Sequence, residues 1–332
     1  MSTDWTDADE YPLATLPDTP LWCENYAFSC FDAKRDIAMI ALLGRWPALT
    51  EIWRELLLIS LGDERVICVR QHGHAATSRV AAGALFRVEV LRAGHALRLS
   101  YDGPASAQNR DELLSRGLQN HPLQRLRVQL DFTALSPVWN MSGHAARGEA
   151  IAGALHLEQV GSGTGFIEFD GERHVIEQAF MNRDHSRGVR DLRPFRRHCW
   201  AQGRFAEQQI SFNVYAIEVF GVDGLAMANA TVSKGDQRYP AEVIAVELIE
   251  GTDAMLQPYK LHLRSPLGDM HLVNTRSVCC LPIGVTHPWE AYAGITPGTH
   301  CMTTFEEPVH WAWDGLQGIG WSERAYNPAP FT

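Results

Sequence analysis

Residues 183–198 read RDHSRGVRDLRPFRRH and place six arginines, two aspartates and two histidines in sixteen positions of a chain that is only 20% charged. Asp184 precedes His185, and a carboxylate beside an imidazole can orient the ring and set its pKa for general acid or base work. Arg187 and Arg190 could bind a carboxylate or phosphate of a substrate in a bidentate manner. The alternative is a salt-bridged loop between two domains that carries no chemistry.

A second candidate is the segment GALHLEQV at residues 153–160. On a strand, His156 and Glu158 share one face because side chains alternate between the two faces. If that face is enclosed, burial raises the pKa of Glu158 towards the range that suits proton transfer. If it faces water, neither side chain has a special role.

The segment WCENYAF at residues 22–28 places Glu24 and Tyr26 on one strand face among aromatic side chains. A glutamate buried there would need hydrogen-bond partners. The alternative is an edge strand with Glu24 in water.

Near the C-terminus, WAWDGLQGIGWSE at residues 311–323 predicts a hairpin with bulky side chains towards a core, and Glu323 is an unusual charge in such a strand.

His72 and His74 could bind a metal from one strand face. No acidic residue follows closely enough to complete a ligand set, so a surface loop is favoured. A metal enzyme that combines them with His156 is the weakest functional hypothesis. The chain has no GxSxG, P-loop, HExxH or CxxC motif, and GSGTG at residues 161–165 is interpreted as a turn. We therefore predict no metal and no cofactor.

The elements that must position these residues are mostly strands, because apolar and polar residues alternate along many segments. One short helix is expected at residues 111–119, and residues 47–62 are assigned to a strand. Turn dipeptides such as Asp170-Gly171 separate the strands. The expected strands cover residues 64–71, 81–94, 95–103, 124–135, 153–160, 165–180, 209–220, 241–250 and 259–266.

Many antiparallel strands predict an all-β fold, and their number exceeds that of one small barrel. We predict two lipocalin-like antiparallel barrel or sandwich domains in tandem. An N-terminal tail (1–20) precedes the first domain (21–183), and the second domain follows (184–332).

The composition also excludes some classes of function. A net charge of −10 argues against general nucleic-acid binding, and the chain has no run of eighteen apolar residues that predicts a membrane span. The N-terminus lacks a secretory signal pattern, which predicts a cytoplasmic protein with its seven cysteines reduced. A homodimer is plausible.

Four motifs together resemble the family of carotenoid 1,2-hydratase (hydroxyneurosporene synthase) and the AttH-like proteins. They are the early strand with Glu24 and Tyr26, HLEQ with GFIEFDGE (156–172), RDHSRGVRD (183–191) and GIGWSE (318–323). The resemblance spans nearly the whole chain. It implies two lipocalin-like domains with an apolar pocket, and cofactor-free hydration, isomerisation, cyclisation or elimination of a hydrophobic substrate.

The resemblance also places residues near the reaction. In the carotenoid hydratases an aspartate is thought to protonate a double bond near His, Trp and Tyr residues, and His198, Trp200 and Tyr215 lie where a similar set would fall. Ile217 stands where that aspartate would be, and this difference argues against the hydration of an unactivated alkene. Arg187 stands where relatives carry tryptophan, which indicates a substrate with a polar or anionic end.

We therefore predict an enzyme, a lyase, hydratase or isomerase that acts on a hydrophobic, aromatic or terpenoid-like small molecule. The alternative is a non-catalytic carrier, in which the arginine-rich segment clasps the domains. The proton-transfer candidates are Asp184, His185 and Glu158. The substrate-binding candidates are Arg187, Arg190, Tyr26, Glu24, His156, Trp200, His198 and Tyr215.

Overall fold

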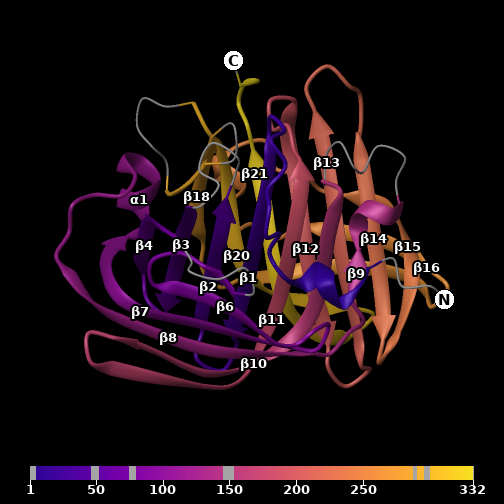
Figure 1. Cartoon of the computed structure of the whole chain (residues 1–332). Helices are drawn as coiled ribbons and strands as arrows, with labels where there is room; N and C mark the ends of the chain where they lie inside the picture. Colours follow the sequence, from indigo (N-terminus) through magenta and orange to yellow (C-terminus); the bar gives the residue numbers. More distant parts are fainter. Residues whose placement is uncertain are drawn as a thin grey trace.

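The computed structural model describes residues 5–45, 52–74, 80–144, 153–286, 290–294 and 300–331, and strands dominate it (Figure 1). They form two antiparallel sheets. The predicted all-β class is confirmed, and so is the short helix expected at residues 111–119, which is α1 (Arg110–Arg116). The strand assigned to residues 47–62 is confirmed over residues 53–61, and residues 47–51 lie outside the described part of the chain. Three short 3₁₀ turns accompany them: η1 (Asp7–Glu10), η3 (Met141–His144) and η4 (Thr252–Ala254).

The first sheet closes into an eight-stranded up-and-down barrel, because its first strand pairs with its last and β4 pairs with β7. The barrel strands are β1 (Trp22–Asp32), β2 (Ile37–Arg45), β3 (Trp53–Leu61), β4 (Arg65–Gly73), β7 (Ala96–Asn109), β8 (Leu123–Ala134), β10 (Leu155–Phe169) and β11 (Glu172–Val189). Three short strands extend it: β5 (Val80–Ala82), β6 (Phe86–Arg92) and β9 (Trp139–Asn140).

The second sheet repeats this plan, with β12 paired to β21 and β17 to β20. Its barrel strands are β12 (Phe195–Phe205), β13 (Ile210–Val219), β14 (Met227–Lys234), β15 (Gln237–Val246), β16 (Lys260–Ser265), β17 (Gly268–Ser277), β20 (Met302–Trp313) and β21 (Leu316–Tyr326). Two more strands, β18 (Leu281–Thr286) and β19 (Glu290–Ala293), continue from β20.

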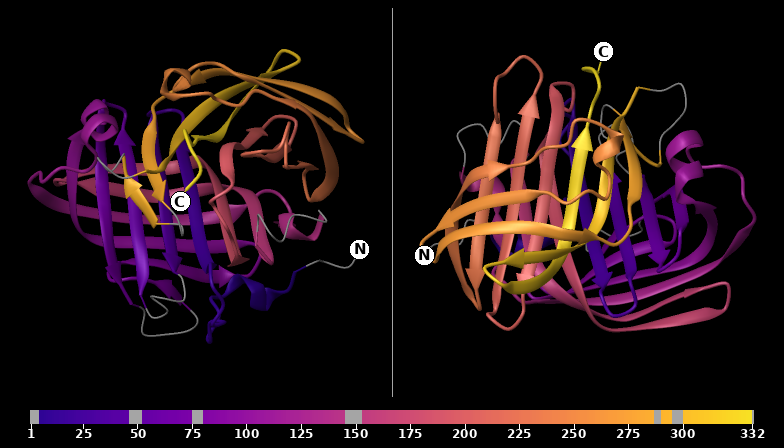
Figure 2. Two further views of the ribbon diagram at one scale, coloured as in Figure 1. Left: turned by 90° about the horizontal axis from the view of Figure 1, so that it is seen from above. Right: turned by 180° about the vertical axis from the view of Figure 1, so that it is seen from behind.

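The two barrels lie side by side (Figure 2), and strand alternation gives an apolar core between the barrels in addition to the core inside each of them. On β1, Tyr26 and Phe28 fill the first barrel, whereas Ala27 and Phe31 point outwards. The outward residues pack against Ile217 and others from the second barrel. Both faces of β1 are therefore buried, and the outer faces of the barrels enclose an interface in which polar groups are removed from water.

Two expectations need correction. The strand expected to end at Phe180 continues to Val189, so the change of sheet falls at residues 190–194 and the division between 183 and 184 lies inside β11. The stretch 161–165 is not a turn but part of β10, with a register shift between Gly163 and Gly165. Gly165 has φ 144°, and a Cβ there would collide with the carbonyl of Gln129 on β8. Glycine is needed for close strand packing at this bulge.

Among the residues that the structure describes, no helix is both long and apolar enough to cross a membrane.

Candidate active site

A cavity of about 100 Å³ lies between the two barrels. Its walls come from the outer faces of β1, β2, β3, β10 and β11 on one side and of β12, β13, β18, β19, β20 and β21 on the other. Apolar side chains such as Leu42, Ile283 and Met302 form part of the lining. The polar and charged lining residues are Asn25, Arg54, His156, Asp184, Ser186, Arg190, His198, Tyr215, Thr304, Glu306 and Glu323.

Asp184 and His185 do not form the expected dyad. They are consecutive residues of β11, so their side chains leave the strand on opposite faces. Asp184 borders the cavity between the barrels. His185 points into the first barrel, where its ring stacks on Tyr26 with centroids 3.9 Å apart.

The histidine that does pair with Asp184 is His156, from the neighbouring strand β10. Burial lowers the pKa of His156, but the charges and hydrogen bonds of Asp184 and Glu158 outweigh it and raise that pKa to about 9. Burial likewise opposes ionisation of Asp184, yet His156 and then Arg190 bring its pKa below the usual value. At neutral pH the cavity therefore presents an imidazolium held by a carboxylate.

Glu158 stands behind this pair and is not part of the cavity lining. Its Oε1 lies 3.1 Å from His156 Nε2 and accepts a 2.8 Å hydrogen bond from Trp200 Nε1. Its Oε2 accepts hydrogen bonds from Asn182 at 3.1 Å and from Asn213 at 3.5 Å. Burial, followed by the charge of Asp184, raises the pKa of Glu158. Glu158 thus orients His156 and links the barrels, since Trp200 and Asn213 belong to the second barrel.

A second histidine–carboxylate pair, His198 and Glu323, enters the cavity from the second barrel. Burial opposes ionisation of Glu323, but the charge of His198 and a hydrogen bond from Glu306 lower its pKa to about 2. The ring of Tyr215 lies between the two pairs, with centroids 6.0 Å from His156 and 5.7 Å from His198.

Besides Glu158 and His185, three expected substrate-binding residues lie away from this cavity: Glu24, Tyr26 and Arg187. Inside the first barrel, Glu24 Oε1 lies 3.1 Å from His185 Nε2, and Glu24 Oε2 accepts a 3.0 Å hydrogen bond from Arg45 Nε. Burial opposes ionisation of Glu24, but His185 and Arg45 lower its pKa. Tyr26 donates a hydrogen bond to the carbonyl of Glu10. The expectation that Glu24 is buried and hydrogen-bonded is confirmed.

Arg187 binds the N-terminal segment rather than the cavity, with Nη2 2.5 Å from Asp9 Oδ1. Arg183, on the same face of β11, binds Glu10 through contacts of 2.6 and 3.1 Å. The charged residues at 183–187 therefore serve two faces of β11: one face fastens the N-terminal segment, and the other contributes Asp184 to the cavity. Arg190, just beyond the strand, adds to the cavity, whereas Arg193 and Arg197 bind Asp191 and Glu218.

Two donor sets among the described residues have the spacing of a metal site. The buried set is His156, Glu158 and Asp184, and the more exposed one is His262, Asp269 and His271. His72 and His74 belong to neither of them. His72 lies on β4 rather than in a loop, 3.8 Å from Glu290.

Five polar lining residues, Asn25, Arg54, Ser186, Thr304 and Glu306, were not among the sequence candidates, and Glu323 stood out only as an unusual charge. Ser186 donates a 3.1 Å hydrogen bond to Asp184 and accepts one of the same length from Arg190. Ser186 lies two residues after Asp184 and therefore on the same face of the strand, and this spacing could have indicated Ser186 as a site residue. Arg54 and Glu306 lie on distant strands in unremarkable sequence contexts, so no local signal marks them.

Comparison with solved structures confirms the expected AttH-like fold. An AttH-like protein from Nitrosomonas europaea aligns with TM-score 0.58 at 10% identity, covering 94% of this chain and 98% of that one. CghA, also solved with Sch210972, aligns with TM-score 0.57 at 12% identity, covering 96% and 94%. Kievitone hydratase from Nectria haematococca aligns with TM-score 0.54 at 11% identity, covering 92% and 88%.

At the level of sequence, no curated protein matches the chain. Residues 6–328 do match a family model described as a domain of unknown function, DUF7064. Because that match covers nearly the whole chain, the protein belongs to the DUF7064 family.

Proposed function

We propose that this protein is an enzyme that transfers protons to and from a hydrophobic small molecule, as a hydratase, lyase or isomerase, in the cavity between its barrels. The observation that carries the proposal is the convergence of two histidine–carboxylate pairs, one buried and one partly buried, on one cavity with partly apolar walls. Groups of this kind can act as general acid and base without help from a cofactor.

The two pairs suit opposite roles. His156, protonated below about pH 9, is the acid, because Asp184 and Glu158 stabilise its charge. In the second pair the Glu323 carboxylate is ionised at neutral pH, so the His198–Glu323 pair can accept a proton from the substrate or from water. In a hydration, one proton passes from His156 to the substrate and one passes from water to the His198–Glu323 pair, so the enzyme's net charge is unchanged.

The charge around the cavity favours a substrate with a polar or anionic end. Arg54 and Arg190 both line the cavity and are 4% and 5% exposed. Guanidinium groups in a dry site stabilise an oxyanion or enolate as it forms. The cavity itself takes only a group somewhat smaller than benzene, which an engineered cavity of about 150 Å³ can hold. It therefore suits the reacting end of a larger substrate.

The structural neighbours support a reaction of this class. Kievitone hydratase is named as a hydratase, and CghA has been solved with a small molecule, Sch210972. Since these chains are 11–12% identical to this one, they support the reaction class and leave the substrate open.

A carrier is the second candidate. A cleft of about 1500 Å³ lies between residues 134–139 of the first barrel and strands β14 and β15 of the second. Trp5, Trp139 and Tyr239 line it. This volume favours binding of a large apolar molecule, which a carrier would hold without chemistry.

The test is incubation in D₂O with a panel of unsaturated and hydroxylated aromatic or terpenoid compounds, with mass spectrometry to detect deuterium on carbon or a mass gain of one water. We expect turnover by the wild type and a loss of about 10²–10⁴-fold in His156→Gln. The matched control is His121→Gln, whose ring pairs with Glu112 at 3.1 Å outside the cavity. Binding of these compounds without conversion would favour the carrier.

A further inference from the structure

Glu306 and Glu323 face each other across neighbouring strands and both border the cavity. Glu306 is fully buried, and the side chain of Glu323 is 18% exposed. Two carboxyl groups so close in a site of low dielectric cannot both be ionised without a large cost.

The partners of Glu306 do not offset a negative charge. Its Oε2 accepts a 2.7 Å hydrogen bond from the neutral indole of Trp321, and its Oε1 has no hydrogen-bond donor among the described residues. Within the described residues, no arginine, lysine or histidine nitrogen forms an ion pair with Glu306.

The next residue, Glu307, shows which partners a buried glutamate can have in this fold, and even with them burial raises its pKa. Glu307 points into the second barrel, where its Oε2 accepts hydrogen bonds from Arg324 at 2.7 Å and from Ser277 at 3.1 Å. Its Oε1 accepts one from the backbone of Leu256. Glu306 has none of these compensations, although it is as deeply buried.

The surrounding charges divide the roles between Glu306 and Glu323. Burial, followed by the charge of Glu323 and a hydrogen bond to it, raises the pKa of Glu306 well above the ordinary range. Glu323 instead faces His198, and the charges of His198 and Arg190 lower its pKa. The remaining charged groups around the cavity are Arg54, His156 and Asp184, with Glu307 behind β20.

We propose that Glu306 and Glu323 share one proton at neutral pH and form a second proton-transfer centre, in which Glu306 stores the proton and releases it through Glu323. During turnover the proton leaves Glu306 for Glu323 and passes from there to the substrate. A proton taken up from water or from the product through His198 then restores it. The sharing of this proton does not depend on the proposed function, whereas its use in turnover does.

The first experiment needs no substrate. Infrared difference spectroscopy of the wild type against Glu306→Gln, at pH 7 and 8, should show a protonated-carboxyl band that the variant lacks. The control is Glu218→Gln, because the Glu218 carboxylate is bound by Arg197 at 2.7 Å and should contribute no such band. In Glu323→Gln the band should disappear at a lower pH, because the repelling charge is gone. A Glu306→Gln spectrum identical to that of the wild type at pH 7 would overturn the shared proton.

The second experiment tests the proton transfer with a converted substrate. Glutamine can donate a hydrogen bond but cannot release a proton, so Glu306→Gln should lower kcat by at least about 100-fold and leave KM nearly unchanged. A variant with wild-type kcat would show that Glu306 is only a neutral hydrogen-bond donor and would overturn its catalytic use. If no compound in the panel is converted, the infrared result still decides whether the proton is shared.

Discussion

At the scale of single residues, the chemistry depends on mutual pKa control between side chains from different strands. His156 is an acid at neutral pH only because Asp184 and Glu158 face it, since burial alone would lower its pKa. Asp184 stays ionised for the reciprocal reason. Neither property belongs to one residue, so a change in one partner should alter the titration of the other.

We expect Asp184→Asn to lower the pKa of His156 from about 9 by about 1–3 units, since the charge that raises it is lost while burial remains. A raised histidine pKa keeps the ring protonated up to that pH. The alkaline limb of the kcat/KM profile should therefore lie near pH 9 in the wild type and at lower pH in the variant. NMR titration of the His156 ring measures the same shift directly, and an unchanged ring titration would contradict the assignment.

Arg187→Ala should change stability rather than catalysis, because Arg187 binds Asp9 and the backbone of Tyr11 and is not part of the cavity lining. We expect KM and kcat within about twofold of the wild type in the deuterium assay. A large rise in KM for an acidic substrate would restore Arg187 as a substrate ligand. Arg190→Lys is the informative counterpart, since lysine keeps the charge but not the planar fork.

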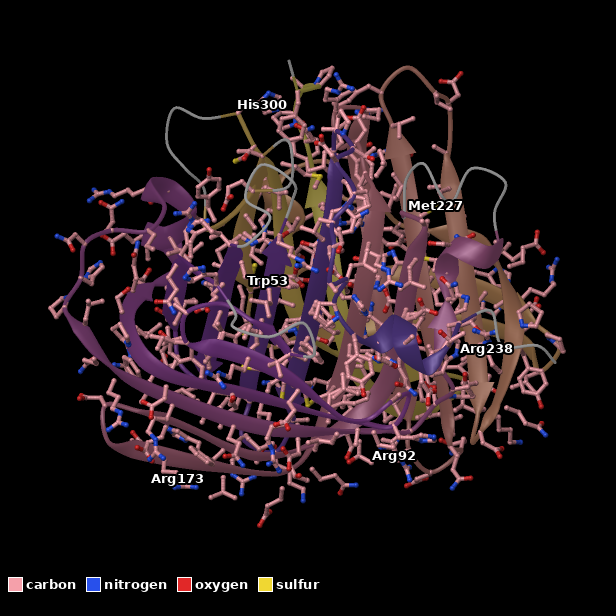
Figure 3. All side chains as sticks on the ribbon, viewed as in Figure 1. Trp53, Arg92, Arg173, Met227, Arg238 and His300 are labelled. Carbon is pink, nitrogen blue, oxygen red and sulfur yellow. The ribbon has the colours of Figure 1, made fainter. Side chains whose placement is uncertain are left out.

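At the scale of elements, β11 combines two tasks because consecutive side chains point to opposite sides. Its outward residues supply the cavity, and its inward residues hold the N-terminal segment. Figure 3 shows the side chains of the described residues on the ribbon. Arg183 and Glu10 are each 1% exposed, so the strand depends on a partner that lies far away in the sequence.

Glu10→Gln should therefore destabilise the fold by about 3–5 kcal/mol, because it leaves the Arg183 charge buried without its carboxylate. Chemical denaturation measures the change in the free energy of unfolding. The control is Asp63→Asn, which removes an exposed ion pair with Arg65 and should cost at most about 1 kcal/mol. Equal effects in the two variants would show that the N-terminal segment is not fastened by Arg183.

At the scale of the whole molecule, the site exists only where two closed barrels meet. Neither barrel supplies both histidine–carboxylate pairs, and Trp200 of the second barrel completes the hydrogen bonding of Glu158 in the first. Substrate access must therefore involve this interface or its edges. Self-association into a homodimer and a cytoplasmic location stay predictions.

Trp200→Phe should lower kcat and shift the His156 titration, because Glu158 loses a donor and holds His156 less firmly. The matched control is Trp311→Phe, which removes an indole hydrogen bond to the Gln202 carbonyl inside the second barrel. Both variants should lose stability, but only Trp200→Phe should alter the pH profile. If Trp311→Phe altered the pH profile in the same way, the effect of Trp200→Phe would be due to a general loss of packing.

The sequence by itself determined the all-β class and many of the strands, because alternation of apolar and polar residues is a local property; β2, β12, β14 and β17 were not among the expected ranges. It also identified six of the residues that line the cavity through residue type and family resemblance: His156, Asp184, Arg190, His198, Trp200 and Tyr215. It failed where glycine marked a bulge within β10 rather than a turn, and where adjacency suggested an Asp184–His185 dyad.

The tertiary structure decided which polar residues act together. A polar residue on the outside of a barrel has the same alternation pattern whether water or a second barrel covers it, so Glu306 and Arg54 carried no local signal. Only the packing of one barrel against the other removes water from those faces. That burial raises or lowers the pKa values on which the proposed chemistry depends.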